Sequence, residues 1–292
     1  MQCGSPVREI LVRSGRVWGV ALGSGATLEA DNVIATIDVQ RVAELLPAEW
    51  LTAPWRRACA ATHSGLFNVG EFKVDAALDR SPEFLDEPPG FAGSLKYLMH
   101  TPDAYLSAMR IVTGGSIPSQ LPLMVAIPSA EDGSQCPPGR ATLWASAFVP
   151  ATLTGGSAWP GANDQAADAV FATLEQFAPG ITASVVKRRV SGPADWEDRL
   201  GNRAGNPNHL DMTIDQLFIL RPAPGFSRYR TPITGLYLSG AGTHPGGGVH
   251  GLPGKLAASA VLADGRGEKP RGSKPSFLTL AKAAWRLRKM WS

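Results

Sequence analysis

The chain contains Gly235-Leu-Tyr-Leu-Ser-Gly-Ala-Gly-Thr-His-Pro-Gly-Gly-Gly-Val-His-Gly-Leu-Pro-Gly254, a stretch in which eight of twenty residues are glycine. Together with the mostly apolar residues 255–262, it predicts a short strand, a glycine-rich turn and a helix. Glycine lets the backbone adopt positive φ and approach a ligand that a Cβ atom would exclude. The free N–H groups at the start of a helix attract anions. The stretch is therefore typical of a site for a diphosphate or for the edge of a flavin.

The glycine spacing differs from that of the turn that opens a dinucleotide-binding Rossmann fold. Gly240, Gly242 and Gly246 are spaced G-x-G-x-x-x-G, and only about thirty residues follow the predicted helix. A second strand with a ribose-binding acid does not fit in that length. Near the N-terminus, Gly23-Ser-Gly25 is the nearest candidate for such a turn, and it lacks the third glycine.

The amino-acid sequences of three segments resemble those of a known family. Asp215-Gln-Leu-Phe-Ile-Leu-Arg-Pro-Ala-Pro-Gly-Phe-Ser-Arg-Tyr-Arg230, with the glycine-rich stretch that follows it, resembles the C-terminal end of the phytoene desaturase-like flavoproteins. These belong to the carotenoid and retinoid oxidoreductase family, and the nearest branch is the pyridine nucleotide-disulfide oxidoreductase domain-containing protein 2 group. Val17-Trp-Gly-Val-Ala-Leu22 and Leu28-Glu-Ala-Asp-Asn-Val-Ile-Ala-Thr-Ile-Asp38 resemble the family's mid-chain hairpin and return strand. The resemblance covers roughly residues 7–264.

The resemblance implies a mixed α/β fold that forms the C-terminal part of a two-domain FAD-binding flavoprotein. Family members begin with a strand, a G-x-G-x-x-G turn and a helix that bind the ADP half of FAD. We expect this chain to lack that N-terminal Rossmann βαβ unit. Three explanations stay open: a truncated reading frame, one half of a split protein, or a degenerate homologue.

The predicted domains are discontinuous. Ser14-Gly15 lies between two alternating runs and predicts a hairpin, and residues 28–35 predict a third, buried strand. We expect the following layout: a partial FAD-binding domain at 1–50, a substrate-binding domain of mixed sheet and helices at 51–194, a return to the FAD-binding domain at 195–264, and a basic amphipathic tail at 265–292.

Within this layout, the polar loop 201–209 precedes the family-like segment and is expected to border the ligand. Residues 163–177 form the clearest amphipathic helix. Other predicted helices are 40–46, 54–61, 193–200 and one running from an N-cap at Asp103 to Ile111; other predicted strands are 66–78, 123–127, 141–148 and 181–190.

The resemblance implies that FAD contacts come from the glycine-rich turn, at Gly240, Ala241, Gly242, Thr243, His244, Pro245, Gly246, Gly247, Gly248, Val249 and Gly251. His244 and His250 are the only catalytic candidates, and they are weak ones, because a histidine in a loop is more often a hydrogen-bonding prop. No metal site is expected, since no ligand spacing accompanies them. Arg221, Arg228 and Arg230 would pair with a phosphate, with an acidic substrate group or with protein carboxylates.

The resemblance implies an FAD-dependent oxidoreductase that dehydrogenates, desaturates or isomerises an apolar, isoprenoid or lipid-like substrate by hydride transfer to the flavin. The middle region would hold this substrate. Several aromatic side chains would line a tunnel or, as the default, fill the core: Phe67, Phe72, Phe91, Tyr97, Tyr105, Trp144 and Phe148. The alternative is a non-catalytic fragment or scaffold subunit that binds a separate ADP-binding half or another protein, so enzymatic activity stays open.

Charge and cysteine content limit which partners and which cellular location we expect. The net charge is +3, and residues 265–292 hold eight cations against Glu268 alone, so the remaining body is acidic and nucleic acid is not expected as a partner. Residues 277–292 predict a helix that lies on an anionic membrane or docks on an acidic protein patch. Three widely spaced cysteines, no secretory signal and no apolar span favour the cytoplasm, with a homo-oligomer also open.

Overall fold

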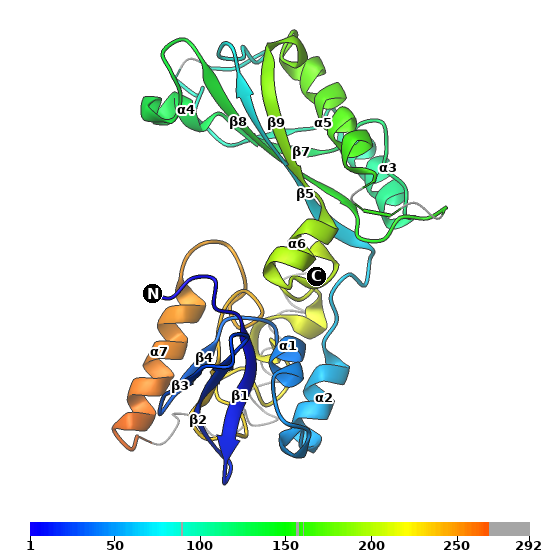
Figure 1. Cartoon of the computed structure of the whole chain (residues 1–292). Coiled ribbons are helices and arrows are strands. Elements are labelled where there is room, and N and C mark those ends of the chain that lie inside the picture. The colour runs from blue at the N-terminus through cyan, green and yellow to red at the C-terminus, as the bar shows by residue number, and fades with distance from the viewer. Residues whose placement is uncertain (89, 156–157, 160, 269–292) are drawn as a thin grey trace, which may run out of the picture.

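The computed structural model describes residues 1–88, 90–155, 158–159 and 161–268, and it has two lobes (Figure 1). The lower lobe combines the N-terminal strands and helices with the C-terminal strand and helix, and the upper lobe is built from residues 69–191. Most of the predicted amphipathic tail, from residue 269 onward, lies outside the described residues. The assignment of the two lobes to cofactor and substrate stays a prediction.

The N-terminal hairpin is confirmed. Strand β1 (Val7–Arg13) pairs antiparallel with β2 (Arg16–Leu22), and β3 (Thr27–Glu29) pairs antiparallel with β2. Strand β4 (Val33–Ala35) instead pairs parallel with β10 (Leu236–Leu238) in a separate two-stranded sheet.

The single return strand predicted at 28–35 is therefore wrong. Residues 30–32 carry the chain from one sheet to the other, because the Ala30 N–H still donates to Trp18 while the Val33 N–H donates to the Gly235 carbonyl. The prediction that this strand is buried is also wrong. The Ile34 side chain is 42% exposed, since β4 has a strand on one side only within the described part of the chain.

Three helices cover the lower lobe, α1 (Val39–Glu44), α2 (Ala53–Ala61) and α7 (Leu252–Gly265). Helices α1 and α2 lie on the opposite side of the strands from α7 (Figure 1). Asp38 begins α1 because its carboxylate accepts hydrogen bonds from the N–H groups of Gln40 and Arg41. The core centres on Trp55, whose ring meets that of Phe226 edge-on at 5.1 Å between centroids.

The upper lobe is one antiparallel sheet in the order β6-β7-β8-β5-β9. Its strands are β5 (Val69–Leu78), β6 (Lys96–Leu98), β7 (Leu123–Ala126), β8 (Ala141–Pro150) and β9 (Val185–Ser191). Helices α3 (Pro102–Thr113) and α5 (Asn163–Phe177) lie against the same face of the sheet (Figure 1). The helix predicted at 163–177 is confirmed, with Ala166, Val170 and Leu174 buried at helical spacing.

Several element boundaries differ from the predictions. Helix α3 begins one residue before Asp103, because the Thr101 hydroxyl caps it by accepting from the Ala104 N–H. The strand predicted from 181 begins at Val185, after a short 3-10 turn. The connection between β7 and β8 contains a helical turn, α4 (Pro128–Glu131). Helix α6 (Pro193–Leu200) is confirmed and joins the upper lobe to the lower one.

The aromatic side chains are mostly not core. Phe72 is buried, whereas exposed fractions are 58% for Phe67, 55% for Phe91, 78% for Tyr97 and 46% for Phe148. The default assignment to the core was wrong because Tyr97 and Phe148 lie on the face of the sheet opposite α5, whereas Phe67 and Phe91 lie in loops outside the strands. No helix among the described residues is long and apolar enough to cross a membrane.

Candidate functional site

The glycine-rich turn joins β10 to α7 and packs against the loop that precedes the family-like segment. A Cβ atom added at Gly247 would lie 2.3 Å from Asn208 Oδ1, and one at Gly242 would lie 3.4 Å from His209. A Cβ atom at Gly240, where φ is +83°, would meet the Thr36 carbonyl oxygen at 2.6 Å. One side of the turn is therefore already filled by protein, and these glycines are needed for that packing.

The end of the turn next to α7 carries unpaired donors. Within the described residues, the backbone N–H groups of residues 247–251 donate to no protein acceptor. Val249 adopts a positive φ of 56°, and its side chain is fully exposed. An added Cβ atom at Gly254, in the first turn of α7, would have nothing within 4 Å. A run of free N–H groups before an open helix N-terminus suits an oxygen-rich ligand group.

A second glycine pattern lies in this segment. Gly246, Gly248 and Gly251 have the spacing G-x-G-x-x-G, so Gly23-Ser-Gly25 is not the nearest candidate for such a turn. They directly precede α7, but residues 239–245 separate them from β10. The pattern therefore lacks the strand that immediately precedes a Rossmann turn.

Arg221 fixes the turn through hydrogen bonds to backbone carbonyls. Its side chain is fully buried, and its guanidinium makes six hydrogen bonds to backbone carbonyls and none to a carboxylate. The accepting residues are Ala241 in the turn and Asn208, Leu210, Asp211 and Gln216 before it. Burial lowers the pKa of Arg221 to about 10. All this donor capacity is used inside the protein, so Arg221 does not reach out to a phosphate.

The histidines of the turn have different surroundings. His250 is exposed, and its Nδ1 accepts a hydrogen bond from the Leu252 N–H at the start of α7, as a prop would. The His244 carbonyl accepts from the Tyr229 hydroxyl, while its buried Nδ1 finds no partner among the described residues. His209, which sequence reasoning missed, also has a buried Nδ1 without a described partner. Burial lowers the pKa of His209, with Arg221 nearby adding to the effect and Asp38 opposing it.

Arg230 fixes the far end of α7. Its guanidinium forms an ion pair with Asp264 at 2.8 Å, and the Tyr237 hydroxyl donates to the same carboxylate. Burial, together with the Asp264 carboxylate, raises the pKa of Tyr237 to about 12. The commoner use that the sequence suggested for Arg230, a protein ion pair, is the one found.

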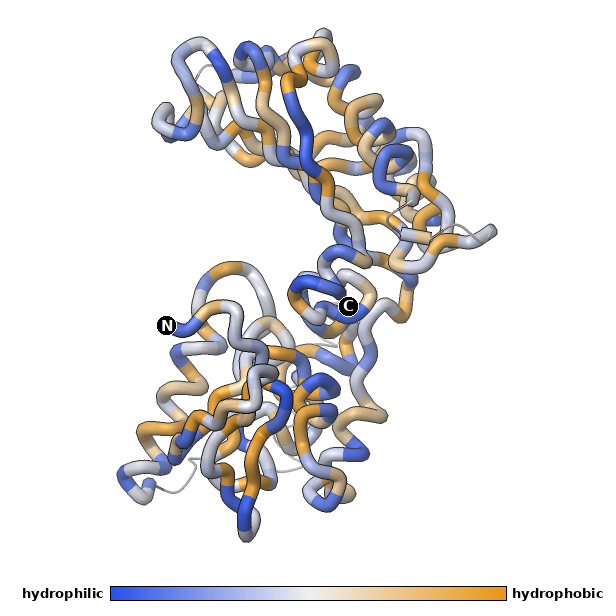
Figure 2. Tube along the Cα trace, viewed as in Figure 1, coloured by the Kyte–Doolittle hydropathy of each residue, from blue (hydrophilic) through white to orange (hydrophobic). Residues whose placement is uncertain are grey.

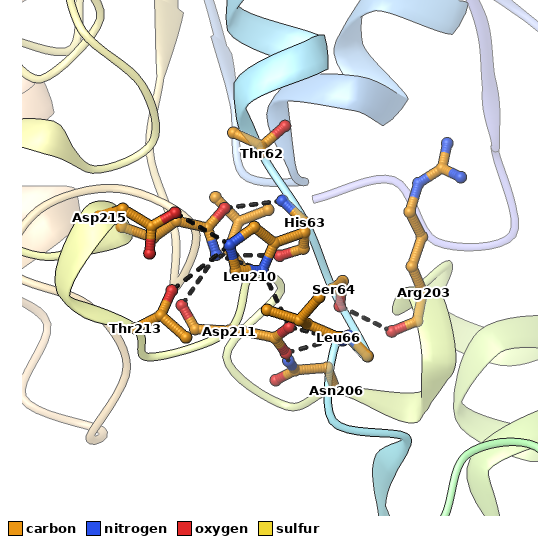
Figure 3. A network of polar contacts seen from close by, with 12 residues as sticks. Thr62, His63, Ser64, Leu66, Arg203, Asn206, Leu210, Asp211, Thr213 and Asp215 are labelled. Atoms are coloured by element: carbon orange, nitrogen blue, oxygen red, sulfur yellow. Dashed lines mark hydrogen bonds and ion pairs between the residues drawn. The ribbon is translucent and has the colours of Figure 1, made fainter.

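The two chain segments that cross between the lobes are tied together by one carboxylate (Figure 3). Asp211 accepts hydrogen bonds from the N–H groups of Gly65 and Leu66 and from the Asn206 side chain. It also contacts His63 Nδ1 at 3.1 Å, and His63 Nε2 lies 3.1 Å from Asp215. The junction is thus a polar network that fixes the orientation of the glycine-rich turn relative to the upper lobe.

His63 is the titratable centre of this network. Burial alone would lower its pKa, but hydrogen bonds to Asp211 and Asp215 outweigh burial and raise the pKa above its ordinary value. Bonds from Thr213 and His63 lower the pKa of Asp215. Asp195 lies in the first turn of α6 and accepts from the Gly192 N–H.

No group of three or more histidine, cysteine or acidic residues within the described ranges is placed to hold a metal ion. The free donors and the buried guanidinium favour an anionic organic ligand over a cation at the turn.

Comparisons with known proteins address the family. The chain is 35% identical over 273 residues to pyridine nucleotide-disulfide oxidoreductase domain-containing protein 2 of Mus musculus, a match that covers 88% of this chain and 46% of that protein. It is 26% identical over 264 residues to phytoene desaturase (lycopene-forming) of Pseudescherichia vulneris, covering 90% of this chain and 51% of that protein. The chain is a homologue of these FAD-dependent oxidoreductases.

The chain spans about half the length of the curated relatives it matches. Its fold matches about half of an oxidoreductase from Methanosarcina mazei, with a TM-score of 0.53, 18% identity, and coverage of 89% of this chain and 49% of that one. No family model matches the chain. The family to which these relatives belong binds FAD.

Proposed function

We propose that this chain forms the flavin-side and substrate-side part of an FAD-dependent oxidoreductase. The observation that carries the proposal is the run of free N–H groups at residues 247–251, directly before α7 and beside the open space at Gly254. Homology to FAD-dependent desaturases supports FAD as the ligand.

In this proposal, FAD when bound supplies a hydride acceptor for a substrate C–H bond. The free N–H groups of 247–251 bind oxygen atoms of the cofactor, and Arg221 keeps the turn in place through the Ala241 carbonyl. His244 and His209 line the turn with buried imidazole nitrogens that have no described partner. The upper lobe binds the substrate, and the reaction is a dehydrogenation, desaturation or isomerisation.

The test uses two glycines of α7 that both face open space. Gly254→Leu places a side chain in front of the helix N-terminus, and Gly265→Leu places the same side chain at the far end of the helix. Both changes remove a helical glycine, so neither should destabilise the helix. Retained flavin absorbance after incubation with FAD is expected for the parent chain and for Gly265→Leu, and a loss of at least tenfold in affinity for Gly254→Leu, as a rough estimate for a blocked site.

Equal FAD binding by the two variants would remove the helix N-terminus from the site. A parent chain that retains no flavin would reject independent cofactor binding by these residues.

A second function, a binding subunit without catalysis of its own, is favoured by the free edge of β4. The Val33 N–H donates to Gly235, and the Ser239 N–H donates to Ala35, so residues 33 and 35 face β10. Ile34 must then direct its N–H and carbonyl to the other edge, where no described strand pairs with it. Such an edge accepts another strand readily. A separate ADP-binding half is the partner that this alternative requires.

A further inference from the structure

One face of the upper sheet is left uncovered by the helices of the described part of the chain. Side chains alternate along β5, so that Phe72, Val74 and Ala76 are buried under the helices and the intervening residues point to the other face. The register carries this uncovered face across all five strands, from Tyr97 in β6 to Arg189 in β9.

The uncovered face is apolar at one side. Tyr97 lies opposite Met124, and Ala126 lies opposite Trp144, so β6, β7 and β8 present an apolar surface that Ser146 interrupts opposite Met124. Phe148 in β8 extends it and is 46% exposed. Tyr97 is 78% exposed, which is unusual for a large aromatic side chain in a strand.

The other side of the same face is charged. Lys73 Nζ forms an ion pair with Asp75 at 2.9 Å, and Glu71 accepts a hydrogen bond from the Ser146 hydroxyl at 2.9 Å. Arg189, which lies opposite Asp75 in the register, has no carboxylate partner among the described residues. Figure 2 shows the hydrophilic run of β9 at this edge of the sheet.

We propose that the substrate of this face is an amphipathic anion, with its acidic head group at Arg189 and its apolar chain across β5, β8, β7 and β6. This inference rests on the proposed oxidoreductase function only in calling the ligand a substrate. The ligand site itself does not require that function. Neighbouring strands lie about 4.8 Å apart, so the four spacings from β9 to β6 cover about 19 Å. That length suits a long acyl chain with a carboxylate at one end.

A fully apolar isoprenoid fits this face less well. Hydrocarbon over the Arg189 guanidinium would remove water from this charge and supply no new partner. An anionic head group at Arg189 would instead form a charge-assisted hydrogen bond. The charged side of the face therefore favours an amphipathic anion over the fully apolar substrates that the names of the phytoene desaturases indicate.

The test is equilibrium binding of hexadecanoate to the full chain without FAD, below the micelle concentration, measured by isothermal titration calorimetry. Hexadecan-1-ol and hexadecyltrimethylammonium are the matched neutral and cationic probes. Arg189→Gln is the test variant. Arg188→Gln is the control, because Arg188 carries the same charge one residue away but pairs with Asp164 and Asp168 of α5 on the covered face.

The proposal predicts that hexadecanoate binds more tightly than the alcohol and the ammonium probe. Arg189→Gln should weaken hexadecanoate by about fivefold, the factor for one partly solvated ionic hydrogen bond, and leave the alcohol unchanged. Arg188→Gln should change neither by more than about twofold. Equal binding of all three probes, or an equal effect of the two variants, would overturn the proposal. Success here with failure of FAD binding would reject independent cofactor binding by this chain and keep the ligand site.

Discussion

Two of the three sheets in the described part of the protein differ in how complete they are. The upper sheet has five antiparallel strands, and helices α3 and α5 cover one face with a large buried apolar cluster. The parallel sheet of the lower lobe has, within the described residues, only β4 and β10, which come from distant parts of the sequence. Two short strands are not stable on their own. The difference indicates that the upper lobe supports its own fold, whereas the lower lobe depends on Arg221, on α2 and α7, and on whatever pairs with the free edge of β4.

Replacing Arg221 should have the largest effect, and only on the lower lobe. Arg221→Met removes six hydrogen bonds to five carbonyls, of which only those of Asn208 and Asp211 keep another donor, at a cost of about 3–5 kcal/mol in the free energy of unfolding. Arg221→Lys keeps the charge but not the planar fork, so an intermediate loss is expected. Denaturant titration with hydrogen exchange resolved along the chain measures this. Unchanged exchange in residues 206–246 would contradict the role given to Arg221.

Leu174→Ala is the matching change in the upper lobe. The side chain is fully buried in α5 against the sheet, and the cavity should cost about 3 kcal/mol. Exchange should increase in residues 69–191 and stay unchanged around the glycine-rich turn. Equal loosening of both lobes would show that they fold as one unit, which the comparison of the two sheets does not predict.

A proline at the free edge distinguishes the two sides of β4. Ile34→Pro removes an N–H group that β10 does not use, so the chain should lose no more than about 1 kcal/mol. Ala35→Pro removes a donor that faces β10 and should cost about 3 kcal/mol. Thermal unfolding compares them. Co-purification with a βαβ-containing half should be lost in Ile34→Pro and kept in Ile34→Thr, whose N–H group remains.

The junction between the lobes should show the smallest effect, as a dependence on pH. The folded-state pKa of His63 is raised, so its stabilising contribution is complete below the ordinary value of 6.5 and is lost as pH rises through the higher folded value. The midpoint of thermal unfolding should therefore fall slightly more between pH 6 and pH 9 in the parent than in His63→Gln. Identical pH profiles would mean that His63 does not gain protonation on folding.

The sequence predicted local features better than those made by distant residues. The helix Asn163–Phe177 was correct to the residue, because its apolar spacing reports the one face that it buries. The return strand was not, because the break at residues 30–32 is set by which strand each half pairs with. The glycine-rich turn was located from its composition, yet the packing of Asn208 and His209 against it was not visible in sequence.

Arg221 shows the same limit at the site. Its neighbourhood in sequence suggested an anion partner, whereas its actual acceptors are carbonyls up to twenty residues away. The uncovered aromatic side chains of β6 and β8 were assigned to the core for a similar reason. Alternation gives two faces to every strand, and only the tertiary structure tells which face the helices cover.

Hydrogen exchange of the chain with and without FAD, compared between the turn and the upper sheet, tests whether the glycine-rich turn is the cofactor site. FAD should slow exchange of the N–H groups at residues 247–251 and in the first turn of α7, and leave exchange in strand β5 unchanged. Unchanged exchange at residues 247–251 in the presence of saturating FAD would contradict the claim that this turn is the cofactor site.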